Sequence, residues 1–137
     1  MKITELNPVL INKIGKVNKN GLKLESGEEK TTKYLTLFGF DIEFIKPTRA
    51  RKVKNPDVLI LGAVWEIKTP TGASKNTIKN RFRRASKQAS KIIFDLRFVK
   101  GDAEETKKQI LDLFKEAGTV RRMMIIEKDG RLFDIIK

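Results

Sequence analysis

The stretch from Pro56 to Lys68 constrains the fold most strongly, because two apolar runs meet there at a tight turn. Residues 58–61 predict one strand, Gly62 and Ala63 a turn, and the residues up to Lys68 a second strand. In a two-residue hairpin of this kind, Asp57 lies across from Lys68. Because side chains alternate along a strand, Glu66 and Lys68 share the face of Asp57. Two carboxylates and an ammonium group are therefore expected to converge.

This hairpin can be central or marginal in the sheet, and the two positions imply different roles. On an edge strand, Asp57 would be only a turn residue, and Glu66 and Lys68 a solvent-facing ion pair worth about 0 to 1 kcal/mol. The continuous apolar character of residues 58–64 favours a central strand instead. Burying charges there for packing alone would cost several kcal/mol each by rough estimate, so a functional site is the preferred interpretation.

The rest of the 137-residue chain predicts one domain, residues 1–137, with a mixed sheet. Residues 1–26 indicate one or two short strands or a short helix. A helix begins at Ser26, with Glu29 at the capping-box spacing, and ends at Gly39. Residues 40–45 alternate as a strand. The fold class is α/β (α+β), a mixed central sheet flanked by helices.

Two further helices and two further strand regions follow the hairpin. A helix from Ser74 to about Ser90 precedes a buried strand at residues 92–96. A second helix begins at Asp102, with Glu105 completing a capping box, and ends at Gly118. Residues 123–126 and 132–136 predict a closing hairpin about a primed turn at residues 128–130.

The charge of the chain points to a polyanionic partner. Thirty Lys and Arg against 17 Asp and Glu give a net charge of +13, which favours nucleic acid over an acidic membrane surface. The loop of residues 46–54 and the helix from Ser74 carry cations without acids. Spacing of 100° per residue places Thr77, Arg81, Arg84 and Gln88 on one flank of this helix, and Lys75, Lys79, Arg83 and Ser86 on the other. The nucleic-acid-binding residues expected here are Lys52, Lys54, Lys75, Lys79, Arg81, Arg84, Lys87 and Gln88.

The chain contains neither cysteine nor histidine, which excludes disulfides, zinc–thiolate sites and catalysis by a histidine base. The side-chain and backbone oxygen atoms are therefore the metal ligands that remain available. The carboxylates of Asp57 and Glu66, with the backbone carbonyl of Ile67, suit Mg²⁺ or Mn²⁺. Such a cation supplies a water of lowered pKa, and Lys68 beside it could neutralise charge on a phosphate. These residues suffice for phosphodiester hydrolysis.

Pro56-Asp57 followed by Glu66-Ile67-Lys68 resembles the signature of the PD-(D/E)XK nuclease superfamily, and the expected element order resembles its αβββαβ core. That core would cover about residues 27–96. The resemblance implies metal ligation by Asp57 and Glu66, a third carboxylate from Glu28 and catalysis by Lys68. It also implies a supporting polar residue, which Gln88 matches. Glu25 and Glu29 compete with Glu28, because a one-residue slip exchanges them.

A closer resemblance comes from Trp65-Glu66-Ile67-Lys68, the basic helix, and Lys87-Gln88-Ala89 leading into residues 92–95. This pattern is similar to the C-terminal toxin domains of contact-dependent growth inhibition proteins, a branch that cleaves tRNA. The resemblance implies a toxin-type endonuclease with tRNA as substrate and an acidic immunity protein as partner. A DNA endonuclease of the same fold and a non-catalytic nucleic-acid-binding module are the alternatives.

The sequence gives no sign of a membrane partner. No apolar run approaches the roughly 18 residues of a membrane span, and the first residues lack a signal-peptide core. Action in the cytoplasm is therefore expected.

Overall fold

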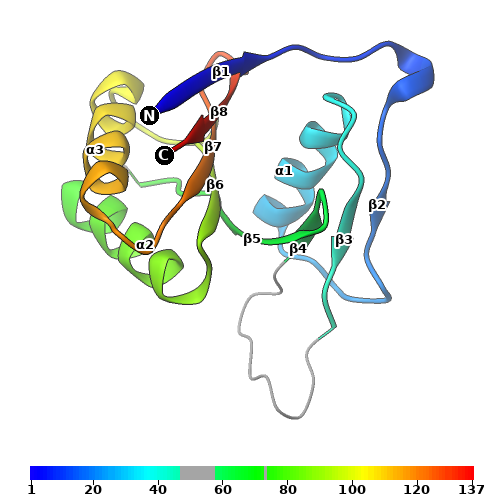
Figure 1. Ribbon diagram of the computed structural model, residues 1–137, viewed down its shortest axis with the longest axis horizontal. Coiled ribbons are helices and arrows are strands. Elements are labelled where there is room, and N and C mark those ends of the chain that lie inside the picture. The colour runs from blue at the N-terminus through cyan, green and yellow to red at the C-terminus, as the bar shows by residue number, and fades with distance from the viewer. Residues whose placement is uncertain (47–57, 73) are drawn as a thin grey trace. The chain divides into compact units, whose positions relative to one another are not determined.

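The computed structural model describes residues 1–46, 58–72 and 74–137. Within them the chain forms a mixed α+β fold, as predicted, with three α-helices and eight strands (Figure 1). In chain order these are β1 (Lys2–Leu6), the 3₁₀ turn η1 (Ile11–Lys13), β2 (Val17–Asn18), α1 (Ser26–Thr36), β3 (Ile42–Phe44), β4 (Val58–Ile60), β5 (Ala63–Lys68), α2 (Lys75–Gln88), β6 (Lys91–Asp95), α3 (Ala103–Glu116), β7 (Arg122–Ile126) and β8 (Leu132–Ile136). No described helix combines the length and the apolar character that a membrane crossing requires.

Strand pairing follows the order β1-β8-β7-β6-β5-β4-β3-β2. The backbone divides into two compact units, one of Met1–Asn7 with Glu66–Lys137 and the other of Pro8–Trp65. Strand β5 crosses the boundary, because its first half pairs antiparallel with β4 and its second half pairs parallel with β6. The predicted core of residues 27–96 thus draws on both units.

The unit containing the C-terminus is built on parallel strands with helical connections. The pairs β5–β6 and β6–β7 are parallel, joined through α2 and α3, while β7–β8 and β8–β1 are antiparallel. Both helices pack on the same sheet face, in one apolar core that includes Phe82, Phe94 and Phe114. The stripe predicted for α2 is confirmed, since Ile78, Phe82 and Ala85 are buried. This packing fixes α2 over the strands that carry the candidate site.

The unit of Pro8–Trp65 contains α1 and a small sheet of β2, β3, β4 and the first half of β5. Ile42 and Phe44 are buried and the intervening Glu43 is exposed, which confirms the alternation expected for this strand. Trp65 is fully buried, and its indole N–H donates to the carbonyl of Ile60 at 3.2 Å. The indole therefore anchors the β4–β5 hairpin.

The register of that hairpin differs from the prediction by one pair. Ile60 pairs with Ala63 and Val58 with Trp65, so the turn residues are Leu61 and Gly62 and not Gly62 and Ala63. Both have positive φ, 55° and 73°, as a type I′ turn requires. The register that placed Asp57 across from Lys68 is therefore wrong for the described pairs. Asp57 itself lies outside the described residues.

The two ends of the chain meet in the sheet. The short strands expected in residues 1–26 are β1 and β2, and β1 pairs with β8 at the opposite end of the sequence. In the closing hairpin, Glu127 N–H donates to the Arg131 carbonyl, and Gly130 has φ 94°. Among the described turn residues only Gly130 has positive φ, so the connection is a three-residue loop and not a primed two-residue turn.

Candidate active site

Glu66 and Lys68 lie on the same face of β5, as the alternation predicts. In the parallel ladder they pair with Ile92 and Phe94, which belong to the core beneath α2 and α3. Both side chains are consequently directed to the helix-covered face of the sheet. The site is therefore built by β5 and faces α2.

The two charged side chains form a buried ion pair. Lys68 Nζ lies 3.2 Å from Glu66 Oε1, and the side chains are only 6% and 1% exposed. Residues 63–65 of β5 pair with β4 and residues 66–68 pair with β6, so β5 is not at an end of the strand order. These observations contradict a solvent-facing surface pair, because each of these ions has lost most of its hydration, at a cost of several kcal/mol.

Gln88 joins the pair from the end of α2. With its amide nitrogen turned toward Glu66, it donates to both carboxylate oxygens at 3.1 Å. This orientation is assigned from hydrogen bonding, since it satisfies the amide and the carboxylate together. Sequence spacing had placed Gln88 on the flank of α2 that also carries Arg81 and Arg84, and the contact directs the Gln88 end of this flank to β5. Glu66 is thus held by a cation and by an amide.

Glu28 lies in α1, in the other compact unit. It is buried, and its Oε1 accepts a hydrogen bond from the backbone N–H of Glu25 at 3.1 Å, within a capping box. Glu25 is therefore the N-cap, which corrects the prediction of Ser26 with Glu29 by one residue. Glu29 instead binds Lys19 at 2.8 Å, and that hydrogen bond lowers the pKa of Glu29. Of the three competing carboxylates, Glu28 is the buried one.

Several expected site residues cannot be placed. Asp57, Lys52 and Lys54 lie outside the described residues. Within the described part of the chain, no three acidic, histidine or cysteine side chains are grouped as metal ligands. On β5, the candidate site therefore has one carboxylate available as a metal ligand, that of Glu66, next to the backbone of Ile67. With no histidine or cysteine in the chain, its donors fit a hard cation such as Mg²⁺ or Mn²⁺.

The cations of α2 are divided between its two flanks. Lys75 and Lys79 border a groove of about 560 Å³ between α2 and α3, whose lining includes Glu105, Asp112 and Glu116. Arg83 follows on the same side, next to Leu113 and Glu116 of α3. The flank with Arg81 and Arg84 instead continues to Gln88. Lys87 is exposed in the last turn.

Sequence reasoning did not single out three other buried acids in the same unit. Asp95 is bound by Arg97, with guanidinium nitrogens 2.8 to 3.2 Å from its oxygens. Asp134 is bound by Arg122 at 2.7 and 2.9 Å. Glu127 is paired with Lys107 and with Arg131. Asp95 and Asp134 lie within predicted strands and Glu127 follows one, but the partner of each acid is fixed by tertiary packing. Because each of these acids is paired with arginine or lysine, we assign them a structural role.

Comparisons with known proteins agree with this architecture. The solved CdiA-CT/CdiI toxin and immunity complex from Burkholderia pseudomallei contains a chain of similar fold, with a TM-score of 0.65 and 19% identity. The match covers 90% of this chain and 100% of that one. No curated protein sequence matches the chain. Residues 54–132, more than half of the sequence, match the family described as the contact-dependent growth inhibition CdiA C-terminal domain. This span contains β4, β5 and α2, and hence Glu66, Lys68 and Gln88. The chain therefore belongs to the CdiA C-terminal domain family.

Proposed function

We propose that this protein is a toxin-type, metal-dependent endonuclease that hydrolyses phosphodiester bonds of structured RNA, with tRNA as the favoured substrate. The observation that carries the proposal is the buried ion pair of Glu66 and Lys68 on β5, to which the exposed Gln88 of α2 donates its amide. Membership of the CdiA C-terminal domain family supports the toxin role. The excess of basic residues supports a nucleic-acid substrate.

The proposal gives each of the three side chains a task. Gln88 donates to both oxygens of Glu66 and so fixes the orientation of the carboxylate. Lys68, 3.2 Å from Glu66, holds a positive charge at a site largely shielded from water. A fixed positive charge in such a place stabilises the negative charge that develops on a phosphate oxygen during hydrolysis. Lys68 is therefore the proposed catalytic lysine.

A divalent cation, Mg²⁺ or Mn²⁺, completes the proposal. Its ligands would be Asp57, Glu66, the carbonyl of Ile67 and Glu28. When bound, such a cation supplies a water of lowered pKa and polarises a phosphoryl oxygen, which is needed where no histidine can act as base. Glu66 would be its anchor among the described residues, because Gln88 and Lys68 already hold this carboxylate in one position.

The proposal extends to a protein partner. The related chain of known structure was solved in a toxin and immunity complex. We therefore expect an immunity protein to bind this chain and block cleavage. The net charge of +13 favours an acidic partner. Co-expression of such a protein would be expected to abolish the nuclease activity of the chain in cells.

The decisive experiment incubates the purified protein with total RNA and plasmid DNA side by side, in Mg²⁺, in Mn²⁺ and in EDTA. Cleavage of tRNA bands, dependent on the cation, is the expected result. The Glu66→Gln variant should abolish cleavage while retaining RNA binding, because it removes the charge and keeps the shape. Asp57→Ala should do the same. Glu104→Gln makes the same chemical change at an exposed acid of α3 and is the matched control.

The outcomes separate the competing functions. Cleavage of plasmid DNA with intact RNA would establish the DNA endonuclease in place of the proposed enzyme. Binding of RNA or DNA without cleavage under every cation condition would refute both enzymes and leave a nucleic-acid-binding module.

A further inference from the structure

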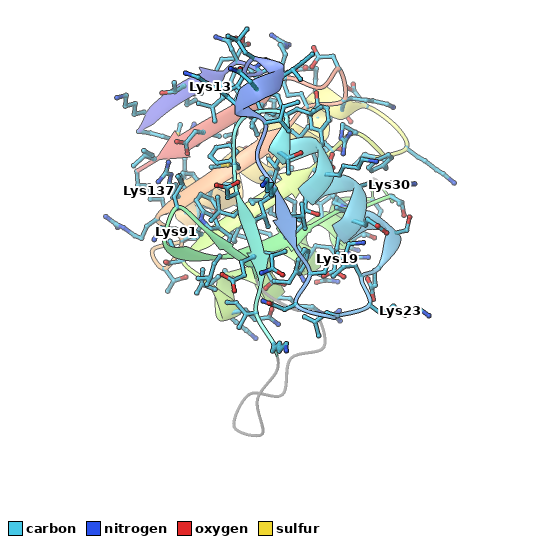
Figure 2. All side chains as sticks on the ribbon, turned by 90° about the vertical axis from the view of Figure 1, so that its right-hand side faces the viewer. Lys13, Lys19, Lys23, Lys30, Lys91 and Lys137 are labelled. Atoms are coloured by element: carbon cyan, nitrogen blue, oxygen red, sulfur yellow. The ribbon has the colours of Figure 1, made fainter. Side chains whose placement is uncertain are left out.

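Positive side chains are spread over the whole chain, so charge alone does not locate the surface that meets the substrate. Figure 2 labels lysines from both compact units, and Lys23 and Lys30 point away from the ribbon. Lys19 lies near them in the sequence, but it is bound to Glu29 at 2.8 Å. A better criterion is an exposed cation that has no acid beside it, close to the buried group of β5.

Helix α2 separates two kinds of cation by this criterion. It contains six Lys or Arg residues and no acid in 14 residues. On the α3 flank, however, Lys75 and Lys79 border the groove that contains Glu105, Asp112 and Glu116. Gln109 of α3 also donates to the carbonyl of Lys75 at 2.8 Å, so this flank is tied to α3. Lys108 of α3 also lines this groove, but a phosphate chain placed there would still meet three carboxylates.

The opposite flank offers a different environment. Arg81 and Arg84 are exposed, and neither forms an ion pair with a carboxylate of the described residues. They lie on the same flank as Gln88, which contacts Glu66. At a rise of 1.5 Å per residue, Arg81 is about 10 Å along the helix axis from Gln88. Arginine also suits phosphate better than lysine does, because its planar guanidinium can donate two parallel hydrogen bonds.

We infer that α2 is a one-sided nucleic-acid-binding helix. Arg81 and Arg84 bind two backbone phosphates of the RNA and guide the strand toward Glu66, whereas Lys75 and Lys79, which share their groove with carboxylates of α3, bind none. This inference rests on the proposed function for its substrate. The sequence analysis expected basic residues of both flanks to bind nucleic acid, whereas this inference restricts phosphate binding to one flank and makes Arg81 and Arg84 substrate-positioning residues.

The test compares two double variants that remove the same charge from the same helix. Binding of a labelled tRNA transcript is measured in EDTA, where cleavage is absent, at salt concentrations from 50 to 200 mM. Each phosphate contact contributes about 0.7 to 0.9 to the slope of log affinity against log salt. Arg81→Ala/Arg84→Ala should therefore reduce the slope by about 1.4 to 1.8. Its affinity deficit should shrink about tenfold across that salt range. Lys75→Ala/Lys79→Ala should leave the slope within experimental error of the wild type.

Cleavage assays in Mg²⁺ then distinguish this inference from the proposed function. Equal slope losses in the two double variants, a larger loss in the lysine pair, or no tRNA binding by the wild-type protein would overturn the inference. The expected slopes together with no cleavage would refute the enzyme and leave the one-sided helix standing. Cleavage together with equal slope losses would support the enzyme and refute the one-sided helix. Circular dichroism of both variants checks that the exposed substitutions leave the fold intact.

Discussion

Removal of the Lys68 ammonium should destabilise the fold, because it leaves the Glu66 carboxylate buried without its cation. At 3.2 Å and an effective dielectric constant of about 20, the attraction within the pair is about 5 kcal/mol. Breaking a buried pair from one side typically costs about 3 to 5 kcal/mol. Gln88 still donates to both Glu66 oxygens in the variant, which favours the lower end. The expected loss for Lys68→Met is about 3 kcal/mol.

The second half of this prediction is that removing the other charge restores stability. In Glu66→Gln/Lys68→Met neither of these two positions carries a charge. The methionine occupies much of the lysine stem's volume, and the amide of Gln88 can donate to the side-chain oxygen of the new glutamine. Replacement of a whole buried pair by neutral groups is often close to neutral in stability. The double variant should therefore lie within about 1 kcal/mol of the wild type, even though both variants are expected to be inactive nucleases.

Equilibrium urea unfolding in EDTA measures both variants, with equal m-values as the condition for comparing their free energies. Lys79→Met is the matched control, since Lys79 is an exposed lysine of the same unit, and its effect should stay within about 0.5 kcal/mol. A Lys68→Met variant as stable as the wild type would refute the argument. A double variant that is less stable than either single one would refute it too.

Three further predictions concern the supports of the site. Leu61→Asn should raise the free energy of unfolding by roughly 0.5 to 1 kcal/mol, because Leu61 is 67% exposed and has the positive φ that Asn tolerates better; a loss in urea unfolding would contradict this. Ser74→Ala should cost about 1 kcal/mol by removing the N-cap of α2, whereas Ser74→Asp should retain stability; equal stability of the two variants would argue against the cap. Lys19→Ala should raise the pKa of Glu29 toward its ordinary value in an NMR titration. In the wild type, the lowered pKa of Glu29 means that this pair stabilises the fold at pH values above the ordinary pKa of a glutamate. That contribution is lost as the pH falls through the pKa of Glu29 in the folded state. An unchanged titration of Glu29 in the variant would show that the pair is absent in solution.

The sequence predicted local features well where a single element determines them. Ser74 begins α2 and Asp102 begins α3, because their side chains bind backbone N–H groups of the first turn. The shared face of Glu66 and Lys68 also followed from alternation along one strand. The family resemblance had singled out Gln88, and its contact with Glu66 depends on the packing of α2 on the sheet.

Features that depend on two elements were placed less well. The hairpin register slipped by one pair because turn preferences favour glycine but not leucine at positive φ. The structure accepts Leu61 there, and this register buries Trp65 opposite Val58. Similarly, the capping box of α1 shifts by one residue, since Glu29 binds Lys19, a partner ten residues away. The pairing of β1 with β8 joins opposite ends of the chain, which no local pattern could indicate.

The double pairing of β5 restricts how the chain length can vary in this region. Residues 63–65 are held by β4 and residues 66–68 by β6, with no connecting loop between them. Deleting one residue from 63–65 would turn Glu66 and Lys68 to the opposite face or break one of the two ladders. Deleting two residues would preserve the alternation of side chains, so Glu66 and Lys68 would stay on the same face of the sheet. Length differences among related toxins should therefore accumulate outside β5, or arise within it in pairs.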